Sequence, residues 1–277
     1  MGEARLLWLE MDGVRGLAPG PADSIWRLVT AQDVSAVFAW SPNARVLALS
    51  DELLSDELLS AALLNDELLN DGALGSFGLD HVTKALDQTT LYEAGAMPHI
   101  VAALRDTALR DTARNNGGST VTDGPIFTFP DEVPVIDADL PIICSDATGT
   151  DRARALARPD NWGPDEWDAL VRGDLGSWAM AIAGRDPIAG REPSAGREPV
   201  SICHTPASND ESAEAGVWTR ADHRGSGLAL ATVRAWWERE RHHRSVLFYS
   251  TTSDNLASRA VARKLGLVPL GWLWKVT

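Results

Sequence analysis

Residues 214–229 read EAGVWTRADHRGSGLA, and this stretch decides the fold. Its first part, which ends at Thr219, is predicted to be a strand, and Gly225 and Gly227 predict a turn that leads into a helix. Glycine allows a backbone to approach a bulky anion closely, and the first turn of a helix supplies unpaired N–H groups and a partial positive charge. The stretch therefore predicts a site that binds phosphate through backbone amides.

Two common phosphate-binding motifs do not fit this stretch. A dinucleotide-binding turn requires a third glycine where this chain has Leu230, and a P-loop requires a Lys-Ser or Lys-Thr pair after the glycines. The pattern that remains is R-x-x-G-x-A over residues 224–229. Because glycine-rich turns before helices are common, an ordinary helix N-terminus is the alternative at this point.

Three further elements follow the turn in a regular order. Residues 245–250 (SVLFYS) are short, apolar and rich in β-branched and aromatic side chains, which predicts a buried strand. Residues 255–266 (NLASRAVARKLG) have an Asp/Asn start and a Gly stop, which predicts a helix. Residues 267–276 (LVPLGWLWKV) predict a last strand with a Pro/Gly break.

This order of elements resembles the Gcn5-related N-acetyltransferase (GNAT) superfamily. The family has a strand, a phosphate loop, a helix, a strand, an N-x-x-[AS] helix that ends in K-L-G-[FL], and a final strand. The resemblance covers roughly residues 134–277. It implies an α/β fold with an α+β mixed sheet, namely a GNAT-like acyltransferase domain preceded by a smaller α/β N-terminal domain. It also implies an N-acetyltransferase that uses acetyl-CoA (coenzyme A) as cosubstrate.

The resemblance assigns the coenzyme contacts position by position. The strand with Val217 and Thr219 would pair its backbone with the pantetheine amides, and Arg224 would flank the pyrophosphate held by the loop amides. Asn255 and Ser258 would bind the pantetheine or adenosine side. The implied cofactor-binding residues are Val217, Thr219, Arg224, Gly225, Ser226, Gly227, Leu228, Ala229, Asn255 and Ser258.

At the catalytic groups the chain departs from the family pattern. Family members often carry a tyrosine as general acid seven residues after the asparagine, and this chain has Ala262 there. Tyr249 is a substitute acid, with packing in the core as its alternative role. Glu214 and His204 are the candidate bases, with a loop-edge carboxylate and a hydrogen-bonded histidine as the alternatives. Cys203 cannot form a dyad with His204, because neighbouring residues of a strand point to opposite faces.

Composition is that of a soluble globular protein. The 277 residues are 44% apolar and 23% charged, and no apolar run approaches the roughly 18 residues of a membrane span. The start of the chain shows no signal-peptide pattern. Cys144 and Cys203 are too few for a disulfide framework and lack metal-ligand spacing, so we expect no metal site and a cytoplasmic location.

The net charge of −14 argues against nucleic acid or an anionic membrane as a partner. An acidic surface favours the approach of a cationic acceptor, which fits a small-molecule or peptide amine. Solubility alone is the alternative reason for the charge. We expect a monomer or a homodimer.

The first half of the chain predicts a small sheet followed by helices. Strands are expected at residues 5–9, 24–29, 34–40 and 45–49, with turns at 19–21 and 41–43. Residues 50–114 are expected to be helical and include five-residue repeats such as DELLS at 51–60. The Asn-Gly-rich segment 115–119 predicts a linker, and the expected domains are 1–125 and 126–277.

The second half of the chain allows a coarse map. A strand is expected within residues 133–143, a helix starting within 151–157, a helix opening at Pro164, and a helix over 228–241. Residues 178–183 and 200–204 predict a hairpin whose loop is lengthened by AGREP repeats and is exposed, mobile and without chemistry. The basic run 239–244 predicts a helix C-terminal cap, and contact with the coenzyme 3′-phosphate is its alternative.

Two functions remain open from the sequence. The first is transfer of an acetyl group from acetyl-CoA to an amine, with catalysis mainly by positioning. The second is a non-catalytic acyl-CoA binding or sensing module, which the alanine at position 262 motivates.

Overall fold

A computed structural model describes residues 1–22, 25–29, 34–55, 101, 105, 120–184 and 197–277. The chain forms two compact units. One unit consists of residues 1–126, 250–256 and 269–277, and the other consists of residues 127–249 and 257–268. The AGREP loop and most of the expected helices of residues 50–114 lie outside the described residues. The division into domains 1–125 and 126–277 stays a prediction.

The first unit is built on a sheet with the strand order β1-β2-β4-β3-β11-β5. Its strands are β1 (Leu17–Ala22), β2 (Ile25–Leu28), β3 (Ala36–Ser41), β4 (Ala44–Leu49), β5 (Val121–Thr128) and β11 (Val268–Val276), and its helices are α1 (Glu3–Arg15) and α2 (Asp51–Ser55). The last strand of the chain lies antiparallel to β3, with Trp274 opposite Phe38. Buried aromatic residues of β3 and β11 therefore share one core, which joins segments that are far apart in the sequence.

The second unit is built on a sheet with the order β10-β9-β8-β7-β6. Its elements are β6 (Ile142–Cys144), α6 (Ala147–Ala153), α7 (Pro164–Arg172), β7 (Trp178–Ala183), β8 (Glu198–Ser208), β9 (Ser212–Thr219), the 3-10 helix η2 (Ala221–His223), α8 (Leu228–Glu240), β10 (Val246–Ser250) and α9 (Leu256–Lys264). Strands β6 to β9 are antiparallel neighbours, whereas β9 and β10 are parallel. The mixed sheet with helices confirms the predicted fold class.

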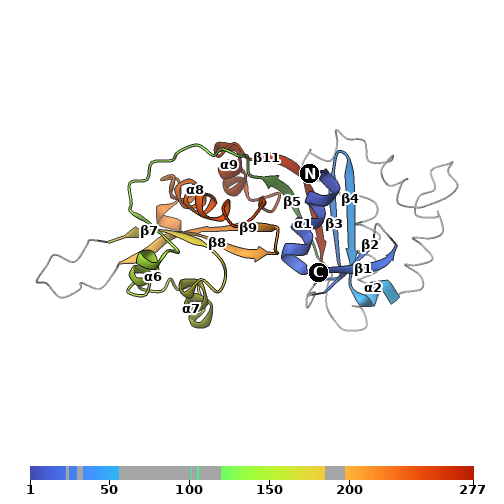
Figure 1. The fold of residues 1–277 in the computed structure, drawn as a ribbon, viewed down its shortest axis with the longest axis horizontal. Coiled ribbons are helices and arrows are strands. Elements are labelled where there is room, and N and C mark those ends of the chain that lie inside the picture. Colours follow the sequence, from blue (N-terminus) through green and yellow to red (C-terminus); the bar gives the residue numbers. More distant parts are fainter. Residues whose placement is uncertain (23–24, 30–33, 56–100, 102–104, 106–119, 185–196) are drawn as a thin grey trace, which may run out of the picture. The chain divides into compact units, whose positions relative to one another are not determined.

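Helices cover both faces of the second sheet (Figure 1). On one face, α8 and α9 pack in a core that contains Trp236, Val233 and Ala262. On the other face, α6 and α7 pack in a core that contains Trp167 and Trp178. Because strand residues alternate between faces, β6, β7, β8 and β9 each contribute to both cores.

The structure corrects two predictions in the first unit. Residues 5–9 were expected to be a strand, but they lie in α1, whose buried residues Leu7 and Met11 are one helical turn apart. A five-residue apolar run does not distinguish a strand from a helix, which explains the error. The expected turn at residues 19–21 lies inside β1, where the prolines are tolerated because β1 is the edge strand of the sheet.

The second half needs four corrections. Residues 129–141 are irregular and only β6 forms a strand, since the prolines at 134 and 141 interrupt the expected one. Helix α6 starts earlier than expected, because the Asp146 side chain caps it by accepting a hydrogen bond from Gly149 N at 2.8 Å. Strand β5 was not predicted, and β11 runs without a break through Pro269 and Gly271. The other expected strands and helices of this half are confirmed.

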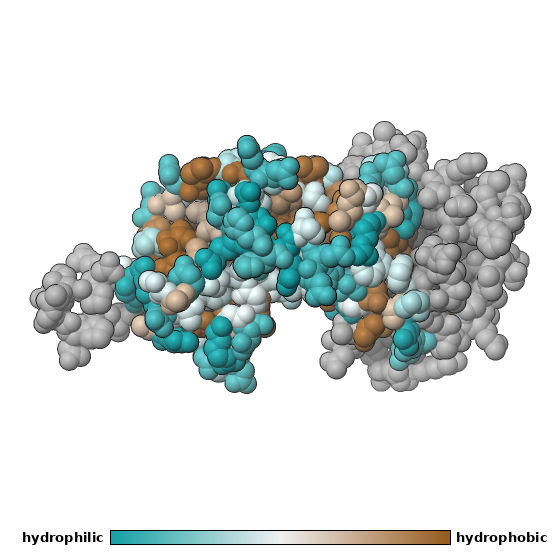
Figure 2. Space-filling view, viewed as in Figure 1, coloured by the Kyte–Doolittle hydropathy of each residue, from teal (hydrophilic) through white to brown (hydrophobic). Residues whose placement is uncertain are grey.

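The described surface is largely hydrophilic in one view of the molecule (Figure 2). Hydrophilic residues occupy much of the described surface in the view of Figure 2, with smaller apolar areas between them. Among the helices that the structure describes, none is both long and apolar enough to cross a membrane.

Candidate functional site

The site begins where two parallel strands separate. Strand β10 pairs with β9 over only three residues, and the last pair joins Phe248 to Glu214. Beyond this pair β9 continues to Thr219 with β8 as its neighbour. The edge of β9 from residue 215 onward therefore has no strand partner among the described residues on the side of β10. A free strand edge offers N–H and C=O groups to an extended ligand.

The glycine-rich loop follows directly after this free edge. Gly225 and Gly227 have φ values of +81° and +84°, which only glycine adopts without strain, and Gly227 is the N-cap of α8. A Cβ atom added to either glycine would meet nothing within 4 Å, so the space beside them is open. Within the described part of the chain, none of the amides of residues 225–230 donates a hydrogen bond. These amides are therefore available as hydrogen-bond donors to an anion.

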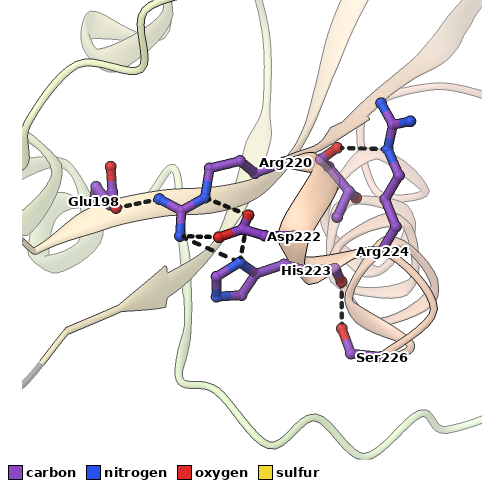
Figure 3. Close-up of polar contacts among 7 residues, drawn as sticks. Glu198, Arg220, Asp222, His223, Arg224 and Ser226 are labelled. Atoms are coloured by element: carbon purple, nitrogen blue, oxygen red, sulfur yellow. Dashed lines mark hydrogen bonds and ion pairs between the residues drawn. The ribbon is translucent and has the colours of Figure 1, made fainter.

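Short polar contacts hold the loop in shape (Figure 3). Arg224 Nε donates to the carbonyl oxygen of Thr219 at 3.2 Å, and the remaining guanidinium nitrogens are left for a ligand or solvent. Ser226 Oγ donates to the carbonyl oxygen of His223 at 2.5 Å. Arg224, Ser226 and Thr219, all predicted coenzyme contacts, are thus brought together. Their role in binding stays a prediction.

A cluster of hydroxyl groups lies beside the loop, where β8, β9 and α8 contact one another. Ser201 Oγ lies 2.8 Å from Thr219 Oγ1 and 3.3 Å from Thr232 Oγ1, so β8, β9 and α8 meet at this point. Thr232 Oγ1 also donates to the carbonyl oxygen of Leu228 at 3.0 Å. Since buried hydroxyls are costly when unpaired, this cluster fixes the first turn of α8 against the strand that precedes the loop.

The arginines at the end of α8 contact the protein itself. Arg239 Nη2 donates to the carbonyl oxygen of Ser145 at 3.1 Å, and Arg241 Nη1 donates to that of Asp131 at 3.4 Å. Arg241 also stacks on Trp237, with 4.5 Å between the guanidinium carbon and the ring centroid. These contacts favour the structural role of the basic run over contact with a coenzyme phosphate.

Glu214 and His204 lie on the same face of the sheet. His204 is the cross-strand partner of Gly216, and Gly216 is two residues from Glu214 on β9. A bulge in β8 follows His204, as is common near functional sites. Cys203 packs in the opposite core, as predicted from the alternation of a strand. The two candidate bases are therefore on the face of α6 and α7.

Tyr249 is on the opposite face. It is 1% exposed, and its hydroxyl lies 2.6 Å from Ser258 Oγ. Burial raises the pKa of Tyr249 to about 12, although the hydrogen bond with Ser258 acts in the opposite direction. Ala262 is fully buried in the same core. The hydroxyl of Tyr249 thus contacts Ser258, and the charge of Glu214 also contributes to the raised pKa of this tyrosine.

Asn255 immediately precedes α9. Its N–H donates to the carbonyl oxygen of Thr252 at 3.1 Å, and this turn starts the helix as the Asp/Asn signal predicted. Val217 lies on β9 and packs against the core of α8. The coenzyme contacts of both residues stay predictions.

Sequence reasoning missed two features of the site. Gly216 is needed because a Cβ there would lie 2.9 Å from His204 Cε1 and 3.0 Å from Pro206 Cγ. Arg220, Asp222 and Glu198 form a charged cluster before the loop. Glu198 is 22 residues from Arg220 and follows the repeat-rich hairpin loop, so no local pattern links the two.

His204 is held in an aromatic environment that disfavours its charged form. Its ring centroid lies 5.1 Å from that of Trp162, and Trp178 is its partner on β7. Burial lowers the pKa of His204, and the Gly216 backbone and the charge of Glu166 only partly oppose this effect. A neutral imidazole can accept a proton, which is what a general base requires.

We expect the free energy of unfolding to fall as the pH drops below about 6.5, because unfolded His204 then binds a proton that the folded state excludes. Above that pH the residue is neutral in both states, so its effect vanishes. The slope from this residue is at most about 1.4 kcal/mol per pH unit. Urea unfolding of wild type and His204→Gln between pH 5.5 and 7.5 measures it, with His242→Gln as the control. An unchanged slope in His204→Gln would contradict the expectation.

The mixed sheet, the separating parallel strands and the glycine-rich loop belong to one α/β domain. Residues 138–268 match the family model described as "Acetyltransferase (GNAT) domain". The C-terminal part of the chain is thus a domain of the GNAT superfamily, as the motifs predicted. GNAT domains are in general acyltransferases that use an acyl-CoA.

Solved structures with a similar fold include three bacterial proteins. A GCN5-related N-acetyltransferase-like protein from Streptococcus suis is 18% identical over 63% of this chain and 68% of its own, with a TM-score of 0.41. A GNAT-family acetyltransferase from Colwellia psychrerythraea is 12% identical over 61% and 60% of the two chains, with a TM-score of 0.39. A GCN5-related N-acetyltransferase from Kribbella flavida is 19% identical over 61% and 63%, with a TM-score of 0.38.

This chain thus spans between 60% and 68% of the length of those three proteins. Among curated proteins, none matches the chain.

Proposed function

We propose that this protein transfers an acetyl group from acetyl-CoA to the nitrogen of an amine acceptor. The observation that carries the proposal is the set of loop amides at residues 225–230, which have no acceptor in the described part of the chain and face open space at both glycines. They follow directly on the strand edge that β10 leaves free. A diphosphate with an extended amide-containing arm has the chemistry that fits both features.

The residues present fit the coenzyme in order along its length. The loop amides from Gly225 to Ala229 would hold the diphosphate, with Arg224 beside it as a cation. The free edge of β9 at Val217 and Thr219 would pair with the pantetheine amides. Asn255 and Ser258 would contact the pantetheine or adenosine side, as the resemblance to the family implies.

The side chains of the protein have a small chemical task, which is mainly to move a proton. Acetyl-CoA supplies a thioester whose thiolate leaves readily. Glu214, at the point where β9 and β10 separate, would take the proton from the amine, directly or through a water. His204 is the second candidate base, because it lies on the same face and burial lowers its pKa. Tyr249 stays a possible acid in the proposal, and its raised pKa makes it the weakest member of this set.

A specific observation favours a second function, that of a non-catalytic acyl-CoA binding or sensing module. The position at which relatives often carry the acid tyrosine is Ala262, which is fully buried here. Tyr249, the candidate substitute for this acid, is buried too. Such a protein would bind the coenzyme and leave the acetyl group in place.

Two measurements on the full chain test the proposal. Calorimetry with coenzyme A and acetyl-CoA measures binding, and release of free thiol in the presence of a panel of small and peptide amines measures transfer. Binding together with amine-dependent thiol release supports the acetyltransferase. Binding without release for every amine supports the sensing module, and no binding of either ligand rejects both.

The acceptor class belongs to the same proposal. The acidic chain favours an amine that is cationic in water, which can be a small molecule or a peptide. A cytoplasmic location and a monomeric or homodimeric state stay predictions.

A further inference from the structure

Arg220 lies four residues before Arg224 and would be the obvious second cation for a diphosphate. The structure shows that its guanidinium already has partners (Figure 3). Nε donates to Asp222 Oδ1 at 2.7 Å and Nη2 donates to Asp222 Oδ2 at 3.0 Å, which is a two-point contact with one carboxylate. Nη1 donates to Glu198 Oε1 on β8. All three nitrogens of this guanidinium are therefore engaged with protein.

These contacts tie the loop to the sheet. The N–H of Arg220 donates to the carbonyl oxygen of Val200 at 2.8 Å, so backbone and side chain both fix Arg220 to β8. Asp222 belongs to η2, the single turn between β9 and the glycines. Arg220 thus connects β8 to η2, the turn that precedes the glycine-rich loop.

His223 extends this chain of contacts to the loop. Its Nδ1 lies 2.9 Å from Asp222 Oδ1 and 3.3 Å from Arg220 Nη2. A protonated Nδ1 donates to the carboxylate and an unprotonated one accepts from Arg220, so the ring is held in either form. The carbonyl oxygen of His223 accepts from Ser226 Oγ. The position of Ser226, between the two glycines, is thereby linked to the charged cluster.

We propose that Arg220 is a positioning residue of the coenzyme site, and that it acts with Asp222 and Glu198 by ordering residues 221–227 rather than by binding phosphate. The inference rests on the proposed function. Arg224 is then the cation of this loop that contacts the diphosphate. A network of one arginine with two carboxylates has more effect than an isolated surface ion pair, because each contact limits the freedom of the others.

The Asp222→Asn variant distinguishes a positioning role of Arg220 from a purely electrostatic effect on coenzyme binding. If only charge mattered, Asp222→Asn would tighten the binding of an anionic coenzyme, because a negative charge near the loop is lost. Positioning requires the opposite result. Arg220 loses its two-point partner in this variant, so the turn loosens and the amides no longer converge.

The experiment compares Asp222→Asn, Arg220→Gln and the double variant by calorimetry with coenzyme A, and by amide hydrogen exchange of residues 220–230 without ligand. Asp174→Asn is the matched control, because Arg172 Nε and Asp174 Oδ2 form an Arg-x-Asp pair at 2.9 Å outside the loop. We expect each single variant to weaken coenzyme binding by about 3- to 10-fold and to speed exchange in the loop, and the double variant to show less than the product of both effects. The control should change neither quantity.

Turnover with the best amine adds a second readout, in which the KM for acetyl-CoA rises and kcat stays constant. Unchanged or tighter binding by Asp222→Asn, or unchanged loop exchange in both single variants, overturns the inference while the proposed function stands. A wild-type protein that binds no coenzyme A overturns the proposed function and the inference with it.

Discussion

Gly227→Ala is expected to weaken coenzyme A binding by about 30-fold or more, because relief of backbone strain at this position displaces amides that would hold the anion. Gly227 has φ = +84°, and an L-residue in this conformation costs about 1–2 kcal/mol. The backbone relaxes to relieve this strain, which turns the amides of Gly227 and the first turn of α8 away from a shared anion. Each charge-assisted hydrogen bond that is lost costs about 1.5–3 kcal/mol. Calorimetry with coenzyme A measures the change.

The chain offers a closely matched control at Gly173, the C-cap of α7. Its φ is also +84°, and a Cβ there also meets nothing within 4 Å. Gly173→Ala should therefore lose a similar amount of stability in thermal unfolding and leave coenzyme binding unchanged. If both variants, or neither, lose affinity, the loop amides are not the diphosphate site.

Glu214→Gln is expected to lower kcat by about 100-fold, which is the typical contribution of a general base. The amide has nearly the same shape as the carboxylate but cannot take a proton from the amine. Coenzyme binding should be unchanged, since the loop amides and the free edge of β9 lie further along the chain. Thiol release and calorimetry on the same samples separate the two quantities.

Glu211→Gln, three residues earlier and before β9, is the control for the loss of charge. His204→Gln in the same assay distinguishes the two candidate bases. Full activity in Glu214→Gln with a large loss in His204→Gln would move the role of base to His204. A Glu214→Gln variant without turnover and with normal binding would exclude the sensing module as the function of the wild type.

Local patterns were reliable where the signal was itself local. The strand 215–219, the glycine turn and the helix from residue 228 depend on neighbouring residues, since a positive φ needs glycine and a helix start needs free amides. The helix that follows Asn255 and ends at Lys264, shortly before Gly266 with φ = +68°, is of the same kind. The short apolar run at 5–9 was ambiguous, and its place in α1 was decided by packing against β3 and β4.

The residues of the candidate site also fall into two groups, those that a local pattern locates and those whose placement depends on strand register. The loop from Arg224 to Ala229, whose role in binding stays a prediction, could be located from the sequence because its residues are adjacent. The shared face of Glu214 and His204, with Gly216 between strand and imidazole, required the register of β8 and β9 and the bulge after His204. Register depends on cross-strand packing, which a single strand does not encode.

The amino-acid sequence alone determined that this chain contains a glycine turn between a strand and a helix, because backbone conformation at glycine and amide exposure at a helix start are properties of a few adjacent residues. Tertiary structure decided which charges remain for a ligand. Arg220 and Arg224 look alike in the sequence, but Glu198 arrives from β8 and engages Arg220. The pairing of distant residues depends on how strands lie beside one another, so only the folded chain distinguishes the two arginines.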